Sequence, residues 1–212
     1  MKKTNLTLKE EQILHEEVAQ QDSHEDQTKG IVGWFYRLYI TETLRFVKKH
    51  GPLVLDIGSG EGVIFKSGEV KPVQLDVSWT RLERSRKHND QLVCADAYSI
   101  PFKDNTFDAV LLIAVLEHTS QPPRILDEVH RILKPGGHLA LLIPNDIQMS
   151  LGRVLLGKWP PRYPDHLSFI TPGRIVKWTS ARFAIVECFP LPFRRFSFWL
   201  NMYYFASLKK NP

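Results

Sequence analysis

The stretch VLDIGSGEG, Val54–Gly62, places three glycines directly after a short apolar run. Glycine lets a chain turn sharply and lets its backbone approach a bound molecule, so this loop predicts a ligand site after a first β-strand. Its GxGxG spacing differs from the GxGxxG spacing that binds a pyrophosphate at a helix N-terminus. Asp56 stands two residues before the first glycine and would repel a phosphate. The stretch therefore favours a ligand that carries a positive charge.

Short apolar runs alternate with longer amphipathic segments after this loop, which is typical of βα units around a parallel sheet. The expected strands cover residues 53–57, 72–77, 91–96, 108–115, 138–144, 184–189 and 202–208. The last two lie close together in the chain and suit an antiparallel pair. We therefore predict an α/β fold with a Rossmann-like, seven-stranded, mostly parallel sheet, helices on both faces and an antiparallel terminal hairpin.

Helical spacing of apolar residues marks three further segments. The expected helices cover residues 8–20, 34–47 and 125–133. Lysines in the last turn and Gly51 would end the second of these helices. Thr171 and Pro172 supply a capping side chain and a first-turn proline for a fourth helix.

Composition indicates one globular domain. The chain has 212 residues, of which 43% are hydrophobic and 24% are charged, enough to bury a substantial core. Its apolar runs suit neither a secretory signal nor a membrane span. The two cysteines, Cys94 and Cys188, fall in expected strands, which argues against a disulfide framework and indicates a cytoplasmic protein. The net charge of +5 comes from scattered residues, so we expect no nucleic-acid partner.

Further motifs follow the glycine loop in a fixed order: DIGSGEG, LDVS, ADAYSIPFKDNTFDAV, LEH and ILKPGGHLALLIPN. Over about Val54–Asn145 they resemble class I S-adenosylmethionine-dependent methyltransferases of the type 11 branch, similar to the ubiquinone and menaquinone biosynthesis methyltransferases. The resemblance implies S-adenosyl-L-methionine as cofactor, a cation without phosphate, which suits the carboxylate of Asp56. It also implies an enzyme that methylates a small-molecule or lipid-like acceptor.

The resemblance implies which residues hold the methyl donor. This donor set is Asp56, Gly58, Ser59, Gly60, Gly62, Asp76, Val77, Asp96, Ala97 and Val115. Asp76 would accept hydrogen bonds from both ribose hydroxyls, which a carboxylate can do; the alternative is an ordinary turn cap at a strand end. Asp96, beside Ala97, would lie near the adenine amino group, and the alternative for it is a helix N-cap. Val115 ends the fourth strand, where the methyl group should face the acceptor.

Two histidines are the candidates for catalysis. His118 follows the fourth strand, and its ordinary pKa near neutrality suits a general base. His166 lies in YPDHLSFITP, in the region where the family builds much of its acceptor pocket. A structural hydrogen bond is the alternative for each histidine. We expect no metal, because no cluster of acidic ligands gathers at the predicted strand ends.

The resemblance also suggests a division of the chain. Residues 1–50 would form an N-terminal helical segment that caps the acceptor pocket, and residues 51–212 the methyltransferase domain. The chain between Gly62 and Asp76 is shorter than the family leads us to expect, so the first helix after the loop should lose about a turn. The aromatic and basic tail, Pro192–Lys210, would supply the last strand of the hairpin, at an edge of the sheet, or make a peripheral membrane contact.

Two other functions stay open. The basic balance is compatible with a methyltransferase that acts on RNA or protein. The shortened helix is compatible with a non-catalytic module that binds S-adenosylmethionine. No Asn-Pro-Pro-Tyr-like run follows the fourth strand, which argues against methyltransferases that act on the amino groups of adenine, cytosine or glutamine.

Overall fold

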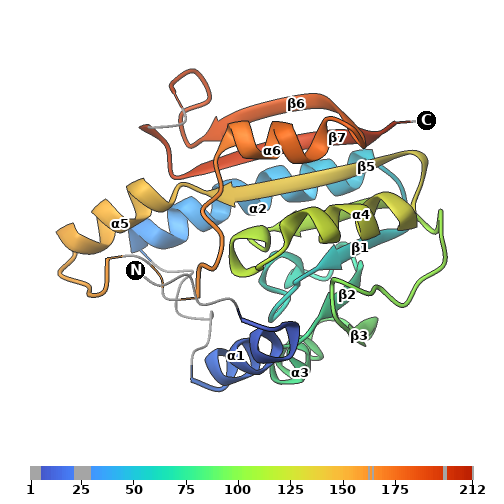
Figure 1. The fold of residues 1–212 in the computed structure, drawn as a ribbon, viewed down its shortest axis with the longest axis horizontal. Coiled ribbons are helices and arrows are strands. Elements are labelled where there is room, and N and C mark those ends of the chain that lie inside the picture. Colours follow the sequence, from blue (N-terminus) through green and yellow to red (C-terminus); the bar gives the residue numbers. More distant parts are fainter. Residues whose placement is uncertain (1–5, 22–29, 162, 164, 198–199, 212) are drawn as a thin grey trace.

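One mixed sheet of seven strands forms the centre of the protein (Figure 1). The computed structural model describes residues 6–21, 30–161, 163, 165–197 and 200–211. The strands are β1 (Val54–Ile57), β2 (Val73–Asp76), β3 (Leu92–Cys94), β4 (Phe107–Ile113), β5 (Leu133–Pro144), β6 (Phe183–Leu191) and β7 (Tyr203–Lys210). Their spatial order is β3-β2-β1-β4-β5-β7-β6. The predicted fold class is confirmed.

Strand direction changes between β5 and β7. The first five strands pair in parallel, whereas β7 pairs antiparallel with both β5 and β6. β1 lies between β2 and β4, so the chain crosses to one side of β1 and then to the other. In open α/β sheets, ligands bind beyond the carboxyl ends of the strands at such a switch in strand order. The topology therefore places the loop after β1 at the expected binding position.

Both faces of the sheet are buried. In β4, Val110 and Leu112 belong to one core cluster, and Ala109, Leu111 and Ile113 belong to the other. Alternate side chains of a strand point to opposite faces, so a doubly covered strand is apolar throughout.

The helices that cover the sheet differ between its faces. The helical elements are α1 (Leu8–Gln21), α2 (Gly30–Lys49), η2 (Val63–Phe65), α3 (Trp79–Ser85), η3 (Leu116–His118), α4 (Pro122–Ile132), α5 (Asp146–Leu155) and α6 (Pro172–Thr179). Side chains of α4 and α6 join the first core cluster, and side chains of α2 and η2 join the second. Because α2 shares a core with the sheet, it packs as part of the main domain; the division at residue 50 stays a prediction.

Three details differ from the sequence-based expectations. A helix shortened by about one turn was expected after the glycine loop, but the structure has only the 3-10 turn Val63–Phe65 there. β7 is the inner strand of the terminal hairpin and β6 lies at the edge. The helix α5 was not predicted, although Ile147, Leu151 and Leu155 follow helical spacing; in the structure these side chains are exposed. Asn145 starts it by accepting hydrogen bonds from the backbone N–H groups of residues 147 and 148.

Two further expectations concern the cysteines and the membrane. Cys94 in β3 and Cys188 in β6 are free, and these strands lie at opposite edges of the sheet. Among the described residues, none of the helices combines the length and the apolar character that crossing a bilayer requires.

Replacing a core leucine of α4 should destabilise the protein strongly. Leu126 is fully buried, whereas Leu155 in α5 is 78% exposed. We expect Leu126→Ala to lower the free energy of unfolding by about 2–5 kcal/mol and the matched control Leu155→Ala to change it by less than about 0.5 kcal/mol. Urea unfolding followed by circular dichroism measures both. Equal losses in the two variants would contradict the assigned packing of α4.

Candidate functional site

The glycine loop after β1 folds back onto the end of β2. Gly58, Gly60 and Gly62 have φ angles of 66°, 54° and 65°, a left-handed conformation that residues with a side chain rarely adopt. The Gly58 N–H donates to the carbonyl of Leu75 at 2.7 Å, and the Gly60 N–H donates to Asp76 Oδ2 at 2.8 Å. These hydrogen bonds to β2 therefore fix the conformation of the loop, and its positive φ angles require glycine.

Asp76 is the side chain that holds this loop. Its carboxylate also accepts a hydrogen bond from the Ser78 N–H, with Oδ1 at 2.9 Å. A carboxylate has about four acceptor positions, so two backbone donors leave capacity for two further donors. Asp76 therefore combines the turn-capping role with the capacity that ribose binding requires; the ribose contact itself stays a prediction.

Asp56 lies in the interior of β1, next to this loop. It is 2% exposed, and burial, with the nearby charge of Asp76, raises the pKa of Asp56 to about 8. A cation bound beside the loop would favour the ionised form. Glu61 is also buried, and its carboxylate lies 2.9 Å from Arg84, so the protein itself supplies a cation for this second charge.

The end of β4 meets the glycine loop at Val115. A Cβ atom on Gly58 would lie 2.7 Å from Val115 Cγ2, so this close contact needs a glycine. The turn η3 begins directly after Val115 and carries Glu117 and His118. Predicted donor and catalytic residues from two loops are thus adjacent in space.

Asp96 and Ala97 lie further out, after β3. Asp96 accepts from the Tyr98 N–H at 2.9 Å through Oδ1 and from Gln12 Nε2 of α1 at 2.7 Å through Oδ2. Ala97 packs against the core beside it, and the Val77 carbonyl accepts from the thiol of Cys94 at 3.6 Å. The local turn cap is present, and the adenine contact stays a prediction.

Predicted site residues His118 and His166 come together although they are far apart in the chain. Their ring centroids lie 4.8 Å apart at right angles. His166 Nδ1 lies 2.5 Å from Asp146 Oδ1, and His118 Nδ1 lies 3.2 Å from both the backbone carbonyl oxygen and Oδ2 of Asp165. The structural hydrogen bond considered for each histidine is therefore present. Each of these contacts uses Nδ1 of the ring.

Charged groups around His118 act on one another. Burial opposes the charged imidazole, but the hydrogen bond to Asp165 and the charge of Glu117 outweigh it and raise the pKa of His118. Burial also raises the pKa of Glu117, which is 1% exposed. Asp165 keeps a pKa below its usual range because the bond from His118 outweighs the effect of burial.

Three carboxylates beside these histidines had no predicted role: Glu117, Asp146 and Asp165. Glu117 and Asp165 directly precede the two chosen histidines. Asp146 follows the fifth strand, at the same edge of the sheet as the glycine loop. That common position at strand ends is the signal that would have pointed to it.

The helix α1 also reaches this edge. Glu11, 3% exposed, accepts from Tyr98 OH at 3.0 Å and from Ser120 Oγ at 2.6 Å. Glu16 accepts from Thr80 Oγ1. These contacts join α1 to the segments that follow β2, β3 and β4. The position fits a cap over the site, although it lies on the side of the predicted adenine contact.

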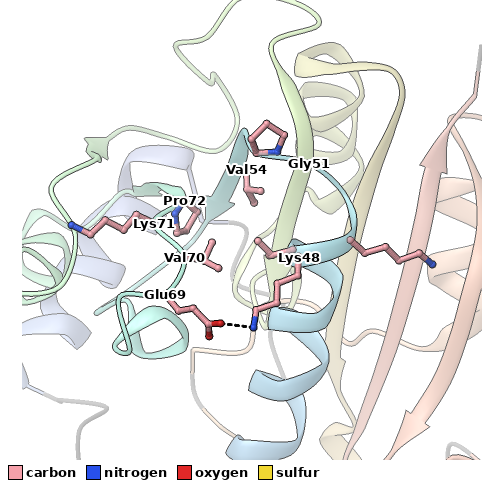
Figure 2. Close-up of a pocket in the computed structure, with 10 residues that line it drawn as sticks. Lys48, Gly51, Val54, Glu69, Val70, Lys71 and Pro72 are labelled. Carbon is pink, nitrogen blue, oxygen red and sulfur yellow. Dashed lines mark hydrogen bonds and ion pairs between the residues drawn. The ribbon is translucent and has the colours of Figure 1, made fainter.

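A surface hollow of about 530 Å³ lies elsewhere, between the end of α2 and the segment that leads into β2 (Figure 2). Its lining includes Val54, Val70 and Pro72, with a Lys48–Glu69 ion pair of 2.6 Å at its edge. It faces the amino ends of β1 and β2. Because ligands of open α/β sheets bind at the carboxyl ends, we do not assign this hollow to the site.

Comparison with known proteins agrees with this geometry. Residues 55–141 match the family described as "Methyltransferase domain". The chain is 34% identical over 113 residues to the ubiquinone/menaquinone biosynthesis C-methyltransferase UbiE of Ruegeria sp., with 45% of each chain covered. It is 33% identical over 100 residues to "Probable tRNA methyltransferase 9B" of Mus musculus, with 45% of this chain and 22% of that protein covered. The matches span less than half the length of these two relatives.

The fold has a close counterpart of the same size. A SAM-dependent methyltransferase from Thermotoga maritima superposes with a TM-score of 0.70 at 20% identity, covering 95% of this chain and all of the other. Residues 55–141 are therefore similar to the methyltransferase domain family, and the chain has the fold of the S-adenosylmethionine-dependent methyltransferase from Thermotoga maritima.

Proposed function

We propose that this protein transfers a methyl group from S-adenosyl-L-methionine to a small-molecule or lipid-like acceptor. The observation that carries the proposal is the glycine loop, which Asp76 holds open at the switch in strand order, with Asp56 buried behind it. Close backbone contact combined with a carboxylate suits a donor that has a cationic amino group, a sulfonium and no phosphate. Asp76 would bind the ribose hydroxyls, and Asp96 with Ala97 would adjoin the adenine.

The transfer needs little chemistry from the protein. The acceptor atom attacks the methyl carbon, the carbon–sulfur bond breaks, and its electron pair stays on sulfur to give neutral S-adenosylhomocysteine. The protein aligns acceptor, methyl and sulfur and excludes water. An acceptor that carries a proton on the attacking atom must lose it, and His118 or His166 would receive that proton or position the acceptor.

The acceptor class has weaker support than the donor. The helix α5 begins just beyond the end of β5. Its exposed apolar side chains, including Leu151, Val154 and Leu155, suit an apolar acceptor. The relative UbiE is named as a methyltransferase of quinone biosynthesis, and the tRNA methyltransferase relative supports RNA as the competing acceptor. Peripheral membrane contact and a cytoplasmic location stay predictions.

Removing the Asp76 carboxylate should weaken donor binding. Asp76→Ala removes a charged acceptor of two ribose hydroxyls and releases the glycine loop, at a cost of about 1.5–3 kcal/mol, which is about a 10- to 150-fold rise in Kd. Titration calorimetry with S-adenosylmethionine and S-adenosylhomocysteine measures it, with the exposed Asp90→Ala as matched control. Unchanged affinity in folded Asp76→Ala would remove Asp76 from the site. Saturable binding of NAD by the native protein would overturn the proposed donor.

Donor binding should release a proton from Asp56. With a pKa of about 8, the carboxyl group is mostly protonated at pH 7, and the cationic amino group of the donor favours its ionised form. Binding should therefore expel about one proton per chain, and affinity should rise as the pH increases toward 8. Calorimetry at pH 7 in phosphate and in Tris, which differ in ionisation enthalpy, reports the release. Asp56→Asn should abolish the proton release and lower the affinity for the donor. Identical proton release in wild type and variant would exclude this role for Asp56.

His166→Ala should impair transfer but not donor binding, because we assign His166 to the acceptor and the glycine loop to the donor. The assay supplies donor with a labelled methyl group and fractionated cell extract, and the labelled fraction identifies the acceptor. We expect label in the small-molecule or lipid fraction, a strong loss of labelling in His166→Ala, and an unchanged donor Kd. His130→Ala in α4 is the control. Label in RNA or protein would show that the proposed acceptor class is wrong. Loss of donor binding in His166→Ala would contradict the assignment of His166 to the acceptor.

A further inference from the structure

We propose that Glu117, His118 and His166 bind a divalent first-row transition-metal ion at the carboxyl end of β4. One ligand atom from each of these side chains lies within 4.8 Å of the other two. Glu117 and His118 come from η3, and His166 comes from the segment between α5 and α6. This proposal departs from the expectation of no metal, which considered only clusters of acidic residues.

Both histidines are oriented as metal ligands usually are. His166 Nδ1 faces Asp146 Oδ1 at 2.5 Å, and His118 Nδ1 faces Asp165 Oδ2 at 3.2 Å. A ring nitrogen that bonds to a carboxylate carries the hydrogen, so the lone pair of the neutral ring lies on Nε2. A carboxylate behind each imidazole fixes the tautomer and the ring orientation in metal sites. Two histidines in one cluster share this arrangement.

The third ligand, Glu117, provides an independent observation. Its side chain is 1% exposed, and Oε2 is buried without a hydrogen-bond partner among the described residues. A buried carboxylate without a partner is costly, whereas a bound cation would satisfy it. A purely structural network accounts for the two histidine–aspartate pairs but leaves the position of Glu117 unexplained.

The ligand types select the class of ion. Two imidazole nitrogens and one carboxylate suit zinc, iron, cobalt, nickel or manganese, whereas magnesium and calcium take oxygen ligands. Metal–ligand bonds of about 2.0–2.2 Å would require the widest pair of ligand atoms to move together by about 1–2 Å. The Glu117 side chain has three rotatable bonds for this movement, while the carboxylates keep the imidazoles in place.

The position suggests what the ion would do. Glu117 lies two residues after Val115, which contacts the glycine loop. Three protein ligands leave coordination positions open, and an acceptor hydroxyl bound there would have its pKa lowered beside the methyl group. This role, and with it an oxygen-bearing acceptor, rests on the proposed function, whereas metal binding by the three side chains does not.

Cobalt binding tests the site directly. The chelator-treated full-length protein is titrated with Co²⁺ and followed by visible absorption and calorimetry, with Mg²⁺ for comparison. We expect about one Co²⁺ per chain and weaker binding of Mg²⁺. Glu117→Gln and His166→Asn should each weaken Co²⁺ at least tenfold, the order of about 10- to 100-fold that even the supporting residues of metal sites contribute.

His138→Asn is the matched control for adventitious binding. His50 and His138 form another histidine pair at the amino ends of the strands, with ring centroids 3.8 Å apart. Co²⁺ affinity should be unchanged in His138→Asn. No binding to wild type, unchanged affinity in both Glu117→Gln and His166→Asn, or a loss confined to His138→Asn would each overturn the proposal.

Two measurements keep the test decisive if a variant folds poorly. Glu117→Gln removes a buried charge, so without metal it should be at least as stable as wild type, while Co²⁺ should raise the Tm of wild type and of His138→Asn but not of Glu117→Gln. X-ray absorption of wild type with bound Co²⁺ should show two imidazole ligands, and a spectrum without them would overturn the proposal. Neither measurement involves methyl transfer, so failure here is distinct from failure of the proposed function.

Discussion

Hydrogen bonds between the glycine loop and the end of β2 are the constraint on which the site depends. Gly58 and Gly60 donate to the last two residues of β2, Leu75 and Asp76. Parallel pairing of β1 with β2 aligns their carboxyl ends, and this alignment brings the loop within reach of Asp76. The loop conformation follows from this connection, and the position of β1 between β2 and β4 buries Asp56. A donor bound there would meet backbone and carboxylate groups that folding has already fixed.

Carboxylates gather at this one edge of a protein whose net charge is +5. Asp56 and Asp76 belong to β1 and β2, whereas Glu117 and Asp146 belong to η3 and α5, which follow β4 and β5. Three of these groups have their own means of tolerating burial: Asp76 accepts two backbone N–H groups, Asp146 faces His166, and Asp56 takes up a proton through its raised pKa. A cationic donor and a metal ion would supply the charges that this edge does not yet balance.

The N-terminal helix α1 connects the segments that follow β3 and β4. Glu11 and Gln12 hold Tyr98, Ser120 and Asp96, which lie after β3 and β4. Opening this helix would break several buried or half-buried hydrogen bonds at once. In contrast, α2 is part of the core on one face of the sheet. The two N-terminal helices thus serve different purposes, one over the strand ends and one against the sheet.

The sequence by itself determined the fold class, the order of strands along the chain, the glycine loop and the acidic residues at the ends of β2 and β3. These features are local, because apolar spacing specifies strands and helices and because a turn with positive φ requires glycine. Tertiary structure alone decided that β7 lies inside β6, that His118 meets His166 and Asp165, and that His166 meets Asp146. It also decided the burial of Glu117, and it left the apolar residues of α5 exposed. These outcomes depend on which loops the sheet brings to the same edge. The spacing of residues along the chain does not indicate which loops will meet there.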